Sequence, residues 1–314
     1  MTMLMFGDMN LGRQLGQNLL KGEVDYPFVR MKPIIQGADA VFANLESPIS
    51  DQHGETESPI SNFIFCAPPV AATALKRGGI TIVSTANNHA FDYSLQGVRE
   101  TIENLERTGI RHVGTSEDSI KGCLPAVLSA HGIVVGFLAY TQFVNGTNLW
   151  KGRIALFDSV QVKKDINQLR KRADFVIVSF HGGPEYSEEP DKRTRHQLES
   201  IVRAGADVVV GHHPHVPQGI ECVDNKLIFC SLGNFVFNQA APWAKRSFGV
   251  ELKVSKRHST VGIESVRLIP IRAYKQPSPG LPLQELDSLV ARLRSHSNTG
   301  IVTRNDSLFV VRVP

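Results

Sequence analysis

Short runs of β-branched and aliphatic residues recur along the first three quarters of the chain, and each run is followed by polar residues. Apolar runs of this length are typical of buried strands. They occupy residues 3–6, 40–46, 63–65, 80–85, 133–140, 175–180 and 208–210. Helical spacing or helix-bounding residues predict helices over residues 69–77, 95–108, 159–172 and 191–204. The alternation predicts right-handed βαβ units and a mostly parallel layer in an α/β fold.

The pattern changes after the last of these runs. Two alternating stretches, 248–254 and 261–272, have no helix between them and predict an antiparallel hairpin. Further predicted elements are a strand and turn over 226–235, a helix over 283–294 and a last strand over 308–313. We therefore expect a single domain over residues 1–314, in which residues 1–235 carry the chemistry. Residues 236–314 then form a C-terminal β-hairpin and helix extension.

Five of the predicted strands end on polar side chains that could bind a metal. The run 208–210 leads into Gly211 and three histidines, and glycine allows a sharp turn there. The candidates at the five strand ends are Asp8, Asn44 with Glu46, Asn88 with His89, His181, and His213 with His215. Open α/β sheets bind ligands at this edge, and mixed carboxylate, amide and imidazole donors suit Mn, Fe or Zn.

Each candidate also has a plainer interpretation. Asp8 could cap the helix that follows it, and Asn88 could simply make a turn. Glu185 and Tyr186 could be a surface ion-pair partner and a packed ring. Histidines in one surface loop need no metal at all. Five polar strand ends in one layered fold nevertheless favour a metal site, because unpaired buried polar groups are costly.

Composition narrows the class of protein. The 314 residues are 42% hydrophobic and 20% charged, with a formal net charge of +4, which is ordinary for a globular protein. This charge is too mild to indicate nucleic-acid binding. The four cysteines form no CxxC pair. No stretch reads as a signal peptide or a membrane span, so we expect a cytoplasmic protein without a membrane anchor.

The motifs together resemble the calcineurin-like metallophosphoesterase superfamily, and more closely the CapA-type poly-gamma-glutamate capsule biosynthesis proteins. The residues that carry the resemblance are Gly7-Asp8 with Leu11-Gly12-Arg13, Ala43-Asn44-Leu45-Glu46-Ser47-Pro48, Ala86-Asn87-Asn88-His89 with Asp92, His181-Gly182-Gly183-Pro184-Glu185-Tyr186, His213-Pro214-His215-Val216 and Ser231-Leu232-Gly233-Asn234-Phe235. They span about three quarters of the chain. The resemblance implies a layered β-sandwich core flanked by helices, with one or two divalent ions (Mn, Fe or Zn) at the strand ends.

The resemblance also implies roles for single residues. It implies six metal ligands: Asp8, Glu46, Asn88, His181, His213 and His215. His89 would be the general acid that protonates the leaving group, with Asp92 to orient it. His212 is expected to be a neighbour, because the family pattern uses the two histidines that flank Pro214. Two departures stand out: Asn10 occupies a position that is usually histidine, and Glu46 replaces an aspartate as the bridging carboxylate.

The predicted function is a metal-dependent hydrolase that acts on a phosphoester or on a glutamyl-type amide. Arg13 is the best candidate to bind a substrate anion, since guanidinium pairs bidentately with carboxylate or phosphate. Further candidates for substrate contact, from the same motifs, are Asn44, Glu185, Tyr186 and Asn234. The alternative is a non-hydrolytic protein that binds or assembles poly-gamma-glutamate or another anionic polymer. A purely structural metal domain is the third alternative and fits the donors least well, because structural sites are usually closed Cys/His tetrahedra.

The polar stretch from Asp51 to Ser61 contains Gly54 and Pro59 and follows directly after Glu46-Ser47-Pro48. It can bury little surface, so we expect it to be mobile or to lie across the mouth of the site. The plain alternative is a loop that happens to be long. We expect the loop to influence substrate choice without supplying a metal ligand, and His53 is the residue that could contradict this.

Overall fold

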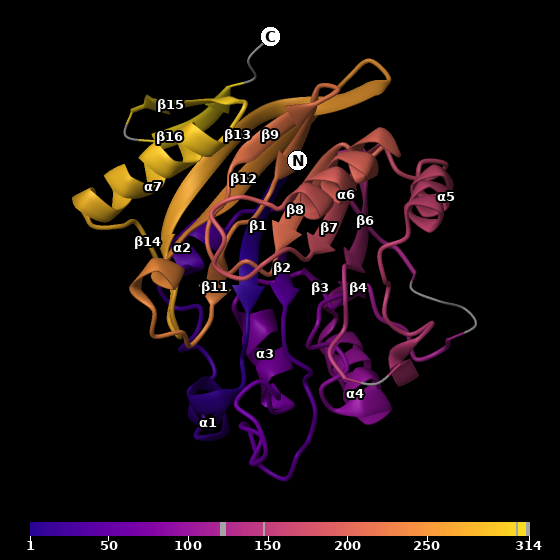
Figure 1. Cartoon of the computed structure of the whole chain (residues 1–314), viewed down its shortest axis with the longest axis vertical. Coiled ribbons are helices and arrows are strands. Elements are labelled where there is room, and N and C mark those ends of the chain that lie inside the picture. The colour runs from indigo at the N-terminus through magenta and orange to yellow at the C-terminus, as the bar shows by residue number, and fades with distance from the viewer. Residues whose placement is uncertain (120–123, 147, 306, 312–314) are drawn as a thin grey trace.

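The computed structural model describes residues 1–119, 124–146, 148–305 and 307–311. Its strands form two sheets that lie face to face (Figure 1). The first has the order β15 (Gly300–Arg304), β16 (Ser307–Val311), β13 (Thr260–Arg272), β12 (Arg246–Arg257), β1 (Thr2–Met9), β2 (Ala40–Leu45), β3 (Ile82–Ser84) and β4 (Arg111–Val113). Two short strands join this sheet, β11 (Asn234–Val236) beside β1 and β14 (Ser278–Pro279) beside β13.

The second sheet has the order β5 (Ala126–Ala130), β6 (Ile133–Thr141), β7 (Phe175–His181), β8 (Val208–His212), β10 (Lys226–Phe229) and β9 (Ile220–Val223). Strands β6, β7, β8 and β10 are parallel, as are β1, β2, β3 and β4 in the first sheet. In Figure 1 the arrowheads of β1, β2, β7 and β8 point to the same end of the molecule. The carboxyl ends of both parallel sets therefore meet there.

Helices cover the outer faces of both sheets. The α-helices are α1 (Arg13–Leu20), α2 (Lys32–Ile35), α3 (Val70–Arg77), α4 (Ser94–Thr108), α5 (Ser159–Leu169), α6 (Lys192–Arg203) and α7 (Leu283–His296), and the 3-10 helices are η1 (Asn148–Trp150) and η2 (Pro242–Lys245). Capping explains where several of them begin and end. Asp158 and Asp191 accept hydrogen bonds from the first turns of α5 and α6, and Gly109 ends α4 with a φ of 71°.

The alternation of side chains along β1 shows how the layers are held together. Met3 and Met5 point into the core between the two sheets, whereas Leu4 and Phe6 point outwards to the helical layer that contains α1 and α3. Across the sandwich, the rings of Phe42 on β2 and Phe137 on β6 stack with centroids 5.9 Å apart. A third cluster packs α5 and α6 against the outer face of the second sheet. The predicted layered β-sandwich flanked by helices is confirmed.

Two pairs of backbone segments approach too closely for any side chain at the site end of the sandwich. A Cβ atom on Gly7 would lie 1.7 Å from the carbonyl oxygen of Gly233, and one on Gly211 would lie 1.9 Å from that of Cys230. Only glycine permits such contacts. They bring the end of β1 beside the start of β11, and the end of β8 beside the residues that follow β10.

The C-terminal part adds strands to the first sheet. β12 and β13 form the long antiparallel hairpin that the sequence predicts, and β12 pairs antiparallel with β1. Helix α7 extends two residues beyond the predicted 283–294, and of the predicted last strand residues 312–313 lie outside the described residues. The predicted strand at 63–65 is wrong, because Phe65 forms only an isolated bridge with Glu57. The division into residues 1–235 and 236–314 stays a prediction.

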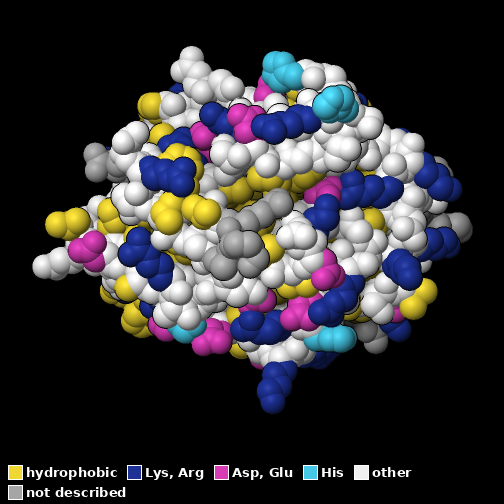
Figure 2. Space-filling model, turned by 90° about the horizontal axis from the view of Figure 1, so that it is seen from above, with side chains coloured by type: hydrophobic (Ala, Val, Ile, Leu, Met, Phe, Trp, Pro, Cys, Tyr) yellow, Lys and Arg dark blue, Asp and Glu magenta, His cyan; other side chains and the backbone are white. Residues whose placement is uncertain are grey.

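The surface agrees with the modest net charge. Lys and Arg side chains lie intermingled with Asp and Glu side chains on the described part of the face in Figure 2. Within the described ranges no helix combines the length and the apolar character needed to cross a lipid bilayer. The expectation that the protein does not bind nucleic acid stays a prediction.

Candidate metal centre

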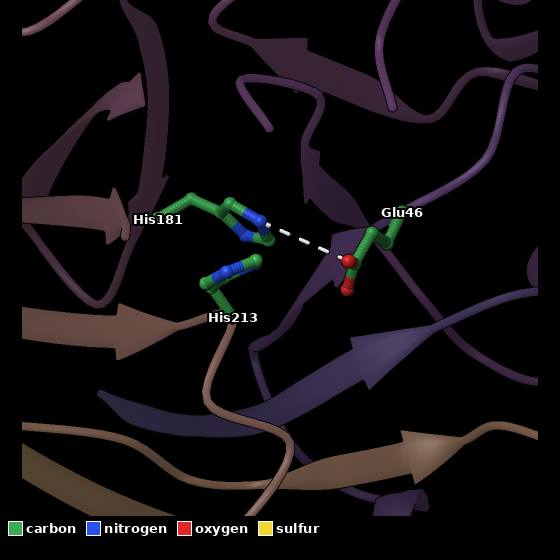
Figure 3. A group of neighbouring side chains, drawn as sticks. All are labelled: Glu46, His181 and His213. Carbon is green, nitrogen blue, oxygen red and sulfur yellow. Dashed lines mark ion pairs between the residues drawn. The ribbon is translucent and has the colours of Figure 1, made fainter. Parts of the chain in front are cut away.

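Three buried side chains from three different elements face one another at the carboxyl ends of the central strands (Figure 3). Glu46 follows β2, His181 ends β7, and His213 follows β8. Glu46 Oε1 lies 3.8 Å from His181 Nε2. One donor atom from each of the three residues lies within 4.8 Å of the other two. We call these residues the His181 group.

A second set of donors, the Asp8 group, lies directly beside it and consists of Asp8, Glu46 and His215. His215 Nδ1 is 3.3 Å from Asp8 Oδ2, and its Nε2 is 3.6 Å from Glu46 Oε1. All three side chains are buried. Glu46 belongs to both groups, so its carboxylate lies where it could serve two neighbouring ions.

Two asparagines complete the arrangement. Asn88 Oδ1 lies 2.8 Å from His181 Nε2, which brings the sixth predicted ligand to the same place. Asn44 is fully buried, donates from Nδ2 to Asp8 Oδ1 at 2.8 Å, and lies 3.2 Å from His181 Nδ1. This position behind the donors favours an orienting role for Asn44 over the predicted contact with substrate.

Two further polar residues concern the Asp8 group, one through a contact and one through its place two residues after Asp8. His212, which ends β8, is buried with its Nδ1 3.3 Å from Asp8 Oδ1, so it is the neighbour that the sequence predicts. Asn10, at the position that is usually histidine, turns its Oδ1 to the backbone N–H of Gly12 at 2.9 Å. Its Nδ2 finds no partner among the described residues. Asn10 therefore gives the Asp8 group no donor in this conformation.

The charges in the cluster act strongly on one another. Burial alone would raise the pKa of the Asp8 carboxyl, but His212 and His215 hold this pKa well below its usual range. Burial raises the pKa of Glu46 well above its usual range; His215 opposes the rise, and Asp8 adds to it. Burial would lower the pKa of His215, yet Glu46 and Asp8 raise it to about 9. Burial, together with His215, lowers the pKa of His213 to about 3. A cation placed between these groups would replace the protons for which they compete.

Unpartnered buried atoms show that a metal would fit here. Neither carboxylate oxygen of Glu46 has a hydrogen-bond partner among the described residues, and the same holds for Nδ1 of His213. Leaving such atoms unpaired in the interior is costly. Imidazole nitrogens with carboxylate and amide oxygens are a donor set that suits Mn, Fe or Zn. The side chains present are therefore those that a divalent ion requires.

A histidine–aspartate pair stands next to the donors. His89 Nδ1 lies 2.7 Å from Asp92 Oδ2, which also accepts the backbone N–H of Phe65 at 2.7 Å. The His89 ring stacks on the Phe65 ring with centroids 3.9 Å apart. Because Asp92 occupies Nδ1, the nitrogen that remains for chemistry is Nε2. The predicted orientation of His89 by Asp92 is therefore present in the geometry.

Residues predicted to contact substrate differ in their exposure and in their contacts. Arg13 places its guanidinium 4.6 Å from the Phe65 ring centroid, and Glu185 is exposed with its carboxylate near His213 and His215. Tyr186 is 42% exposed. Asn234 is 1% exposed, and its amide is used by neighbouring protein groups, so its position does not favour the predicted substrate contact.

The loop from Asp51 to Ser61 lies beside Arg13. Its Thr56 carbonyl accepts the backbone N–H of Arg13 at 2.6 Å, and the Arg13 side chain donates to the Asn62 carbonyl just beyond the loop. His53 is exposed and belongs to none of the candidate metal-binding groups found among the described residues. The loop thus touches a predicted substrate residue without adding a donor.

Strained backbone marks the same residues. Four non-glycine residues of the site adopt positive φ: Arg13 at 53°, Tyr186 at 59°, His213 at 95° and His215 at 58°. Such conformations are uncommon outside glycine and cluster at functional sites. The strain supports the interpretation that these side chains are held in place for binding.

Comparisons with known proteins agree with this arrangement. The family model described as bacterial capsule synthesis protein PGA_cap matches residues 2–239. The capsule biosynthesis protein CapA of Bacillus anthracis is 32% identical over 311 residues, which cover 96% of this chain and 74% of that protein. The PGA biosynthesis protein CapA of Bacillus subtilis is 30% identical over 261 residues, which cover 80% and 67%.

Among solved structures, the calcineurin-like phosphoesterase YfkN from Bacillus subtilis aligns with a TM-score of 0.50. The alignment covers 94% of this chain and 96% of that chain at 12% sequence identity, so it bears on the fold alone. The order of motifs, the two layered sheets and the match over residues 2–239 point to one conclusion. The chain belongs to the family of bacterial capsule synthesis proteins described by the PGA_cap model, and it has the calcineurin-like phosphoesterase fold.

Proposed function

We propose that the protein is a metal-dependent hydrolase of an anionic substrate, either a phosphoester or a glutamyl-type amide. The observation that carries the proposal is Glu46, a buried carboxylate shared by two groups of donors, with no hydrogen-bond partner among the described residues. The residues that would hold one or two ions are Asp8, Glu46, Asn88, His181, His213 and His215. A bound divalent ion supplies Lewis-acid character and an acidified water at such a site.

The protein's own residues divide the remaining work. His89, held through Nδ1 by Asp92, is placed to give a proton from Nε2 to the leaving group. Arg13 binds the negative charge of the substrate, because its guanidinium offers five donors and, within the described ranges, one of them is hydrogen-bonded, to the Asn62 carbonyl. Phe65 contacts both His89 and Arg13. Its ring therefore fixes the distance between the proton donor, His89, and the residue that binds the anion, Arg13.

A second candidate function is supported by the names of the Bacillus relatives, which refer to capsule or PGA biosynthesis. In this alternative the protein binds or helps to assemble poly-gamma-glutamate without hydrolysing it. The His89–Asp92 pair separates the two functions, because a binding protein has no need for an oriented proton donor.

The test compares His89→Ala with the parent protein on panels of phosphoesters and gamma-glutamyl amides in the presence of Mn²⁺, Fe²⁺ or Zn²⁺. The hydrolase function predicts a loss of turnover of roughly a hundredfold or more, with metal content unchanged. His131→Ala is the matched control, because His131 is an exposed histidine paired with Asp39 far along the chain. If the parent turns over neither panel but binds an anionic polymer, the assembly function replaces the proposal.

A further inference from the structure

A continuous line of hydrogen bonds leads from the Asp8 group to the exposed residue Tyr186. His215 Nδ1 lies 2.9 Å from Asn234 Oδ1. Asn234 Nδ2 donates to Gln239 Oε1 at 2.8 Å and to the carbonyl oxygen of Ala244 at 3.1 Å. Gln239 Nε2 in turn donates to the hydroxyl of Tyr186. Two amides thus connect a predicted metal ligand with a residue at the surface.

The direction of this line follows from one acceptor. The Ala244 carbonyl can only accept, so the atom of Asn234 that faces it must be the nitrogen. Asn234 Oδ1 therefore faces His215 and must receive the proton on Nδ1. Gln239 Oε1 accepts from Asn234, which leaves its nitrogen to face Tyr186. The N–H donors of Asn234 and Gln239 therefore point away from the Asp8 group and towards Tyr186.

The fold places Asn234 for this contact. Asn234 begins β11, which pairs parallel with β1 in a register that sets Asn234 opposite Asp8. The close approach of Gly7 to the Gly233 carbonyl holds these two backbones together. With 1% of its surface exposed, Asn234 has a fixed environment and no access to solvent.

We infer that Asn234 and Gln239 are positioning residues, which fix His215 with its proton on Nδ1 and direct Nε2 to the side of Glu46 where a divalent ion would bind. The observation behind this is that Nε2 lies 3.6 Å from Glu46 Oε1, while Nδ1 faces the shorter contact to Asn234 Oδ1 at 2.9 Å and Asp8 Oδ2 at 3.3 Å. Partners of this kind orient ligating histidines and increase metal affinity. This inference rests on the proposed metal centre and assigns its supporting residues.

The experiment measures Zn²⁺ affinity by competition with a chelator, without substrate. Asn234→Leu removes the acceptor at similar size and should raise the dissociation constant for Zn²⁺ by about 10- to 100-fold. Gln239→Met leaves Asn234 in place near the surface and should give a smaller increase, below roughly tenfold. Ser247→Ala is the control, because Ser247 is a buried polar residue that bonds the Leu232 carbonyl outside the line.

A second readout separates positioning from simple support of the fold. In the Zn²⁺-loaded protein, ¹⁵N NMR of His215 should show a slowly exchanging Nδ1–H in the parent and a more rapidly exchanging one in Asn234→Leu, with Gln239→Met in between. Unchanged Zn²⁺ affinity and unchanged Nδ1–H exchange in both variants would overturn the inference, even where thermal stability falls. Because no substrate is present, a parent that binds Zn²⁺ but hydrolyses nothing would refute the hydrolase and leave the positioning role standing.

Discussion

The His181 group and the Asp8 group share Glu46 but differ in what surrounds them. Asn88 places a fourth donor 2.8 Å from His181, whereas Asn10, two residues after Asp8 in the chain, turns its oxygen to the Gly12 backbone. A metal site with more donors of suitable chemistry binds more tightly at equal geometry. The two halves of the centre should therefore bind ions with unequal affinity, although they are neighbours and share a ligand.

The hydrogen bonds behind the histidines differ from residue to residue. In the Asp8 group, Nδ1 of His215 bonds Asn234. In the His181 group, Nδ1 of His181 lies 3.2 Å from Asn44. Nδ1 of His213 has no hydrogen-bond partner among the described residues, and its ring contacts Phe143 edge to face at 5.0 Å. Each group therefore contains one histidine held by an asparagine, so the Asp8 group should also bind an ion, although more weakly.

The largest effect is expected when the ligand that both groups share, Glu46, is removed. Glu46→Gln keeps the shape of the side chain but takes the carboxylate from both groups, so we expect both ions to be lost. The affinity should fall by at least about a hundredfold, the upper end of what loss of a mere supporting residue costs. Metal content after dialysis, measured by elemental analysis, checks this result.

Stability provides the control for this variant. Neither Glu46 oxygen has a hydrogen-bond partner among the described residues, so the metal-free Glu46→Gln protein should melt at the same temperature as the metal-free parent or higher. Glu221→Gln is the matched variant, because Glu221 is a buried carboxylate that pairs with Arg195 away from the centre. It should melt lower and retain its metal. Metal retained by Glu46→Gln would contradict the shared-ligand interpretation.

The sequence predicts the candidate metal donors better than the residues that are hydrogen-bonded to them. Asp8, Glu46, His181 and the two histidines flanking Pro214 could be found because each follows an apolar run, and parallel strands bring such ends to one edge. Gln239 could not be found in this way. It lies in an irregular stretch after β11, and its contact with Asn234 depends on a local turn that no periodicity reveals.

The same limit explains the smaller errors in the fold. The long, periodic elements such as α4, β6 and β7 were predictable, because their apolar spacing is regular over many residues. Short edge strands were missed, among them β5, β9 and β15, since they are half-exposed and owe their conformation to the neighbouring strand. Asn44 and Asn234 appear as polar motif residues in the sequence, and only the layers reveal that they lie behind the donors.

Adding a donor to the Asp8 group tests the same difference in metal affinity from the other side. Asn10→His puts an imidazole where the Asp8 group lacks a donor, so it should raise the metal retained after dialysis from roughly one towards two ions per chain. The loss of the Gly12 contact should cost about 1 kcal/mol of stability. Asn10→Ala loses the same contact without adding a donor and should leave the metal content unchanged. A parent that already retains two ions after dialysis would show that the halves are equal.

The smallest expected effect concerns the loop from Asp51 to Ser61, which touches neither group directly. Its exposed tip is formed by His53 and Gly54, both with positive φ, while Thr56 is buried and holds the Arg13 backbone. Deleting His53 and Gly54 should shift this support and raise KM by up to roughly tenfold, the value of one hydrogen bond to a charged group. The turnover number and the metal content should stay at the parent level, because the donors and the His89–Asp92 pair lie on other segments.

His53→Ala is the matched control. It should change neither KM nor the metal content, since His53 lies in no candidate metal-binding group of the described residues. Loss of metal in either variant would show that the loop contributes a ligand. Unchanged KM in the deletion variant would show that the loop is an ordinary surface connection.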